Sequence, residues 1–208
     1  MNQPVTITTE RVDDIPLLLA QLKRMGVQEL LDEHFPTHGN WQGLSLGQVA
    51  VVWLSHILSQ ADHRLNHVQP WVEHHLQTIG VSLEQDLSGL DLSDDRLESV
   101  LRYLSKDSPW KRFEQALSQR QLQVYDLSPR RVRLERTSVS GFWHVTEDGL
   151  FQKGHSKDHR PDLPQLKLML ATLDPLGLPI ASEIVPGNAA DDPLYEPAVH
   201  QVRQTLGQ

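Results

Sequence analysis

The spacing of the apolar residues changes once along the chain, near residue 127, and this change constrains the fold more than any other feature. Before it, apolar residues recur at three and four positions, as on one face of an amphipathic helix. After DLSPRR, at 126–131, they alternate with polar residues at a period of two, which is typical of strands. The pattern predicts an α+β protein in which an all-helical domain, residues 1–126, precedes a strand-containing domain, residues 127–208.

The first domain contains six segments with helical spacing and recognisable ends: 13–26, 27–36, 45–62, 67–80, 92–106 and 108–125. Segment 45–62 is the most apolar and is the expected centre of this domain, with an apolar face formed by Val49, Val52, Trp53, Ile57 and Leu58. Ser45, Ser93 and Ser108 are the expected N-caps, and Pro109 then takes the first helical position after Ser108.

The second domain contains strand patterns at 131–145, 165–174 and 178–187, and a short one at 150–154 that we expect to pair back onto the first. The tripeptide PLG between the last two long patterns predicts a hairpin. A helix is expected to begin near Pro193. The predicted order is therefore β-β-β-α with antiparallel strands.

The formal charge of -8 is spread unevenly: residues 129–167 carry 8 basic and 5 acidic side chains, whereas residues 1–128 carry 10 and 17. Only this window offers a local site for a polyanion, although a modest basic excess is also typical of solvated surface. The chain has no cysteine, which excludes disulfides and thiolate zinc sites. No apolar run approaches the roughly 18 residues of a membrane helix, so we expect a cytoplasmic protein without a membrane partner.

Two groups of residues suggest a binding site but allow ordinary explanations. Eleven histidines raise the question of a metal, above all His74 with His75 and His155 with His159. No third close ligand completes a zinc set, so structural or solvated histidines are the favoured interpretation. The segment GHSKDHRPDLPQLK, 154–167, is either a polar loop braced by prolines or a cationic clamp for phosphates, in which Arg160 offers parallel donors.

A spaced set of polar residues and glycines runs through the second domain. It comprises carboxylate-x-Thr-Ser at 135–138, then Gly154, His155, Ser156, Lys157, Asp158, Arg160, Pro161, Asp162 and Gln165, then Gly187, Asn188 and Asp191. This set resembles the DDE transposases of bacterial insertion sequences, in particular the branch in which a long helical N-terminal region precedes the nuclease domain. The resemblance covers the whole chain and implies an incomplete ribonuclease-H-like fold for the β-β-β-α region.

The resemblance also implies a chemistry. Such enzymes bind the DNA ends of their element and cut and rejoin DNA with two Mg²⁺ ions, which are held by oxygen ligands from three acidic residues. Glu135 lies where the family has its first Asp, and is the expected catalytic and metal-binding residue. The expected DNA contacts are Lys157, Arg160, Lys167 and Arg136.

Departures from the family pattern argue against catalysis by this chain alone. Glu135 is one methylene longer than Asp, and Arg136, which replaces the usual Thr, should point to the opposite face of the strand. The family's other two acids follow the closing helix and have no counterpart before residue 208. We therefore expect a truncated transposase that binds no Mg²⁺ productively. The alternatives are a non-catalytic DNA-binding or interaction protein that regulates an intact transposase, and a fragment without function.

The resemblance has a structural implication as well. In the complete fold a fourth strand flanks the first, so its absence would leave residues 132–139 as an exposed edge. Exposed edges pair with other strands. We expect self-association or pairing with a complementary fragment through this edge, and weak stability of the second domain.

Overall fold

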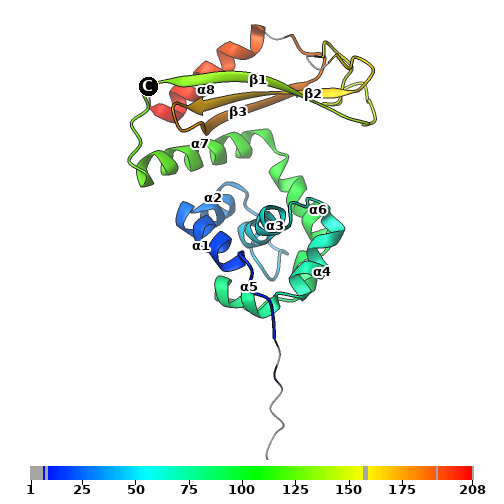
Figure 1. Ribbon diagram of the computed structural model, residues 1–208, viewed down its shortest axis with the longest axis vertical. Helices are drawn as coiled ribbons and strands as arrows, with labels where there is room; N and C mark the ends of the chain where they lie inside the picture. Colours follow the sequence, from blue (N-terminus) through cyan, green and yellow to red (C-terminus); the bar gives the residue numbers. More distant parts are fainter. Residues whose placement is uncertain (1–6, 8, 157–158, 191, 208) are drawn as a thin grey trace, which may run out of the picture. The chain divides into compact units, whose positions relative to one another are not determined.

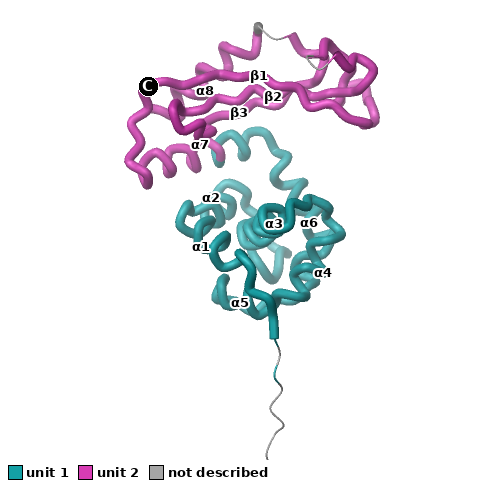
Figure 2. The backbone as a smooth tube through the Cα atoms, in the orientation of Figure 1, with its two compact units in different colours: residues 1–113 teal, residues 114–208 magenta. Residues whose placement is uncertain are grey.

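The computed structural model describes residues 7, 9–156, 159–190 and 192–207 (Figure 1). Among these residues it contains helices and one three-stranded antiparallel sheet, which confirms the predicted α+β class. The chain forms two compact units, 1–113 and 114–208, so the change of unit falls inside one helix, α7 (Figure 2). The elements are α1 (Ile15–Met25), α2 (Val27–His34), α3 (Leu46–Gln60), η1 (Leu65–His67), α4 (Val68–Glu73), α5 (Leu76–Leu83), η2 (Gly89–Leu92), α6 (Asp94–Leu104), α7 (Asp107–Val124), β1 (Val132–Ser140), β2 (Gln165–Leu173), β3 (Leu178–Pro186), η3 (Asp192–Leu194) and α8 (Tyr195–Leu206).

Helix α3 starts where the sequence predicts. Ser45 and Gln48 form a capping box, in which Gln48 N donates to Ser45 Oγ and Ser45 N donates to Gln48 Oε1. Asp32 fixes this helix end to α2, because its carboxylate accepts from Ser45 Oγ at 2.7 Å and from Gly47 N at 2.7 Å. The buried face of α3 includes Val49 and Val52 as expected, but Leu58 is exposed.

The single helix predicted over 67–80 is wrong, because it is broken at His74 and His75 into α4 and α5. The His75 ring Nδ1 donates to Trp71 O at 2.7 Å, the carbonyl that His75 N would use in a continuous helix. His75 N instead donates to Val72 O at 2.9 Å, which tightens the last turn. The competition between the imidazole and the backbone explains the break.

Helix α7 begins at Asp107, so the prediction that Ser108 caps it is wrong. Ser108 lies inside the first turn, where its Oγ accepts from Arg112 Nη1 at 2.7 Å. Pro109 fits there because the first four N–H groups of a helix have no intrahelical acceptor.

The sheet has the order β1-β2-β3, with both pairs antiparallel. The PLG hairpin is confirmed between β2 and β3. The first strand is shorter than predicted, since β1 ends at Ser140 and Gly141 N then donates to Pro164 O. The pattern at 150–154 does not pair with β1. Gln152 instead forms an isolated bridge with Gln165 at the start of β2.

Helix α8 lies along one face of the sheet (Figure 1). The core between them contains Ala171, Leu173, Ile180, Ala181 and Val202, with Leu122, Leu127, Val132, Leu134, Leu178 and Leu206 packed around it. Glu114, in α7, connects the elements of this unit, because its carboxylate accepts from Ser182 Oγ of β3 and from Gln201 Nε2 of α8.

Candidate functional site

The alternation of β1 sets Glu135 and Arg136 on opposite faces of the sheet. Residues at even positions of β1 are half-buried and share the face of α8, whereas those at odd positions are exposed. We call the exposed side the leucine face, because Leu166, Leu168 and Leu170 of β2 line it opposite Val139, Thr137 and Glu135. The expected catalytic residue therefore lies on an open face, and its neighbour Arg136 lies on the covered one.

Glu135 shares its part of the leucine face with a cation. Arg133 binds Asp174, with Nε to Oδ1 at 3.0 Å and Nη2 to Oδ2 at 3.2 Å. The hydrogen bond to Asp174 raises the pKa of Arg133, and the charge of Glu135 adds to the increase. The same hydrogen bond holds the pKa of Asp174 below its usual value. Glu135 thus belongs to a surface charge group rather than to a cluster of acids.

The opposite face carries a row of polar side chains that is almost entirely buried. Gln165 is 0% exposed and Lys167 is 4% exposed, and Lys167 lies opposite Ser138. Lys167 Nζ donates to Ala189 O. Burial lowers the pKa of Lys167, and the charge of Arg136 lowers it further. Contact of Lys167 with DNA would therefore require the segment around Ala189 to move away.

Gln165 joins two distant stretches of chain. Its side-chain Nε2 donates to His155 O at 2.8 Å and to Gly187 O at 3.3 Å. Its backbone exchanges two hydrogen bonds with Gln152, both at 3.0 Å. Gln165 and Gly187, two residues of the set that resembles transposases, thus connect the loop to the sheet. This favours the interpretation of segment 154–167 as a polar loop braced by prolines.

Two glycines of the same set allow this connection. A Cβ atom at Gly154 would lie 2.3 Å from Gly187 O, and one at Gly187 would lie 2.0 Å from Gln165 O. Both neighbouring atoms belong to the backbone, so a side chain at either position would force the segments apart. The glycines are explained by close backbone approach.

The remaining expected DNA contacts differ in their surroundings. Arg160 is exposed and binds Asp162 through two bonds, Nε to Oδ1 at 2.9 Å and Nη2 to Oδ2 at 2.8 Å. That bond raises the pKa of Arg160 and lowers that of Asp162. Lys157, like Asp158 and Asp191 of the resembling set, lies outside the described residues.

Exposed aromatic rings lie beside this loop, and the sequence patterns gave no reason to single them out. Trp143 stacks on Phe151 with ring centroids 4.2 Å apart, and Phe142 is 92% exposed. A shallow depression next to them is also lined by Lys153 and Asp162. The only sequence signal was the apolar pair Phe142–Trp143 in a segment predicted to be strand.

Four histidines of the first unit, His56, His67, His74 and His75, take structural positions. His74 Nδ1 donates to Pro70 O at 2.6 Å, as His75 does to Trp71 O. His67 Nδ1 lies 2.8 Å from Asp62 Oδ2, and hydrogen bonds from Arg64 are the main cause of a lowered pKa at Asp62. His56 is buried, which lowers its pKa.

The residues that the structure describes do not fit a two-metal centre. Within the described part of the chain, no three histidine, aspartate or glutamate side chains gather where they could hold a metal ion. Glu135 has an arginine as its charged neighbour on the leucine face, whereas Mg²⁺ needs several oxygen ligands at short, regular distances. No catalytic step through Mg²⁺ can be assigned to these residues.

Comparison with known proteins identifies no relative. No protein-family model, curated protein or solved structure matches this chain. In the described ranges, no helix has the length and apolar character needed to span a membrane.

Proposed function

We propose that the chain is a transposase-like protein of the DDE group that binds the DNA ends of an insertion sequence and does not cut DNA by itself. The observation that carries the proposal is the convergence of the resembling residues. Ser138 lies opposite Lys167, two positions along β2 from Gln165, and Gln165 donates to Gly187. Three separate stretches of the set therefore meet at one end of the sheet, as residues of one fold motif should.

The order of elements supports the same proposal. Helices come first, followed by three antiparallel strands and a helix on one face, which is the order expected for a ribonuclease-H-like unit after a helical region. On this proposal, Glu135 corresponds to the first catalytic acid of the family. Since no three histidine, aspartate or glutamate side chains gather among the described residues where they could hold a metal ion, the proposed activity is DNA binding. The proposed location is the cytoplasm.

The proposed DNA contact is the loop end of the second unit. Arg160 and Lys153 are exposed there, and Phe142 offers a ring face for stacking on a base. Arg160 already holds Asp162, so a DNA phosphate would compete with that carboxylate. This competition predicts modest affinity with a marked salt dependence.

Binding can be tested by fluorescence anisotropy with duplexes that flank the protein's own gene and with scrambled duplexes. We expect binding below about 10 µM at low salt, with the salt slope reduced by about 0.9 in Arg160→Gln if that side chain contacts one phosphate. Arg102→Gln is the matched control, because Arg102 is an exposed arginine paired with Glu98 in α6. Absence of binding to any duplex at low salt would refute the proposal.

Cleavage is tested separately with supercoiled plasmid and Mg²⁺ or Mn²⁺. We expect the wild-type protein and Glu135→Ala to give the same background of nicked plasmid, since one carboxylate cannot replace the three ligands of a two-metal site. Metal-dependent nicking that is lost in Glu135→Ala would contradict this part of the proposal and leave DNA binding intact.

The alternative, regulation of an intact transposase by mixed assembly, is favoured by one observation, the edge position of β1 in the sheet. It predicts that adding this protein lowers the strand-transfer rate of an intact transposase with the same DNA ends. The control variant Leu134→Pro should not do so, because proline removes an outward N–H donor from the strand.

A further inference from the structure

The outer edge of β1 presents a regular row of backbone groups. Arg131 O accepts from Asp174 N at 3.0 Å, and Gly141 N donates to Pro164 O at 3.1 Å, at the two ends of the β1–β2 ladder. Hydrogen bonding alternates along an antiparallel strand, so the odd-numbered residues direct their N–H and C=O groups toward β2. The even-numbered residues of β1, from Val132 to Ser140, therefore direct theirs outward, away from the sheet that the described residues form.

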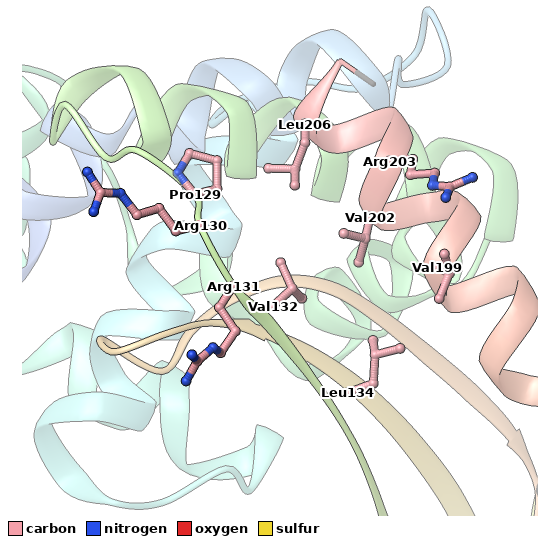
Figure 3. Close-up of a pocket in the computed structure, with 9 residues that line it drawn as sticks. All are labelled: Pro129, Arg130, Arg131, Val132, Leu134, Val199, Val202, Arg203 and Leu206. Atoms are coloured by element: carbon pink, nitrogen blue, oxygen red, sulfur yellow. The ribbon is translucent and has the colours of Figure 1, made fainter.

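A groove lined by both apolar side chains and arginines follows the same edge. A cavity of about 340 Å³ lies between β1 and α8. Val132 and Leu134 of β1 point into it from one side, and Val199, Val202 and Leu206 of α8 from the other (Figure 3). The lining is completed by Pro129, Arg130, Arg131 and Arg203. Helix α8 thus leaves apolar surface beside the outward backbone groups, which is the surface that an added strand would cover.

We propose that this edge binds a second copy of the chain, β1 against β1, in an antiparallel pair with its two-fold axis at Leu134. In this register Leu134 faces Leu134 of the second copy, and Val132 faces Arg136. The Val132–Arg136 pair occurs twice by symmetry, so there are three pairs of outward-directed residues. Each pair can exchange two backbone hydrogen bonds, which gives about six bonds in all. The two sheets become one continuous six-stranded sheet, a self-complementary arrangement typical of two-fold dimers.

Charge selects this register over its neighbours. With the axis at Leu134, Arg133 lies opposite Glu135 of the second copy, and the pair occurs twice by symmetry. If the axis lay at Arg133, Glu135 or Arg136, that residue would face the same residue, with the same charge, in the second copy. If the axis lay at Val132, Arg131 would face Arg133 of the second copy. Opposite charges directly across an antiparallel pair stabilise it and like charges destabilise it. Arg133 and Glu135 both lie on the exposed leucine face, where they can meet.

The same register also covers apolar side chains of the groove. Leu134 of each copy lies beside Leu134 of the other on the α8 face, next to Val199 and Val202. Each α8 lies on that same face of the joined sheet, so the two groove linings are adjacent across the axis. Apolar surface that is accessible in one copy becomes buried in the pair, which supplies the driving force. The dimer does not depend on DNA binding, so either proposal can fail without the other.

A charge exchange tests the register. We expect the 208-residue protein to dimerise in the micromolar range by sedimentation velocity. Glu135→Arg and Arg133→Glu should each weaken their own dimers at least about tenfold, because both opposite pairs become like pairs. An equimolar mixture of the two variants should restore dimers, since every pair is then opposite. Glu147→Arg, the same charge change at an exposed loop position of this unit, should leave dimerisation unchanged.

A disulfide trap tests the geometry independently, and the chain has no native cysteine. In the proposed register, Thr137 lies opposite Arg131 of the second copy. Thr137→Cys and Arg131→Cys should cross-link when mixed and oxidised, but neither should cross-link alone, since two copies of either position are about 20 Å apart. A monomer at every concentration, a dimer insensitive to Glu135→Arg, or equal cross-linking of each variant alone would overturn the proposal.

Discussion

Replacing Gly187 by alanine tests whether close backbone approach holds the loop segments to the end of the sheet. The new Cβ would lie 2.0 Å from Gln165 O and 2.5 Å from Gln152 O. Neither atom can rotate away, because both are backbone carbonyls. The substitution must therefore separate Gly187 from the Gln152–Gln165 bridge.

The expected cost follows from the hydrogen bonds that this separation breaks. They are Gly187 N to Leu150 O at 3.1 Å and Gln165 Nε2 to Gly187 O at 3.3 Å. At about 1 kcal/mol net for each bond, the free energy of unfolding of this unit should fall by about 2 kcal/mol. That is a large share of the roughly 5–15 kcal/mol that stabilises a typical domain.

Native-state hydrogen exchange with mass spectrometry measures this change locally, in peptides that cover β2 and β3. Gly177→Ala is the matched control in the same unit. A Cβ atom at position 177 would meet no neighbouring atom, and the only cost comes from the left-handed backbone, with a φ of +66°. It should cost only about 1 kcal/mol. A Gly187→Ala protein with exchange no faster than that of the control would refute the close-approach reasoning.

Three further predictions concern other parts of the chain. In a urea titration, Glu114→Ala should lower the free energy of unfolding of the second unit by about 2 kcal/mol, because the carboxylate no longer accepts hydrogen bonds from Ser182 and Gln201. Gln115→Ala is the control in the same titration, since Gln115 makes only a long contact of 3.4 Å to Gln204 O. The lowered pKa of buried His56 means that the unfolded chain takes up a proton there first as the pH falls, so the first unit should lose stability as the pH falls through about 6.5, the ordinary pKa of histidine. Tryptophan fluorescence in urea should show a smaller loss in His56→Phe, and an equal loss in both proteins would contradict the assignment. In dilute protein, amides of Val132, Leu134 and Arg136 should exchange faster by NMR than those of Arg133, Glu135 and Thr137, and a uniform rate along β1 would contradict the alternation.

The sequence predicted those parts of the fold that depend on local patterns. The N-cap at Ser45 and the alternation of β1 depend on neighbouring residues, so the sequence alone was enough to predict them. The helix break at His75 could not be predicted from the sequence, because it depends on the His75 imidazole, which donates to a backbone carbonyl of its own helix. The bridge of Gln152 to Gln165 depends on contacts between distant segments, which no local period encodes.

The candidate site shows the same limit. Lys167 has the residue type of a DNA contact, but its position in a strand that is buried at every second residue places the ammonium beneath the segment of Ala189. The transposase-like glycines were recognised as part of a set, whereas their physical role required the distances between Gly154, Gly187 and Gln165. The residue types indicated which segments to consider for a binding site. The packing determined whether each side chain there is exposed or takes part in a structural contact.

Glu135 links the two proposals, and the substitution Glu135→Asp separates its possible roles. A carboxylate beside Arg133 is a poor cation ligand but a good partner for an arginine across a two-fold axis. Aspartate keeps the charge and is the acid expected at this position from the resemblance to transposases. If Glu135 served as a metal ligand, Glu135→Asp should retain or increase metal-dependent nicking. If it serves as an edge charge, the variant should keep dimerising, Glu135→Gln should dimerise less well, and neither should nick DNA. We expect the second result, because the other acids of a metal site are not gathered around this strand in the described residues.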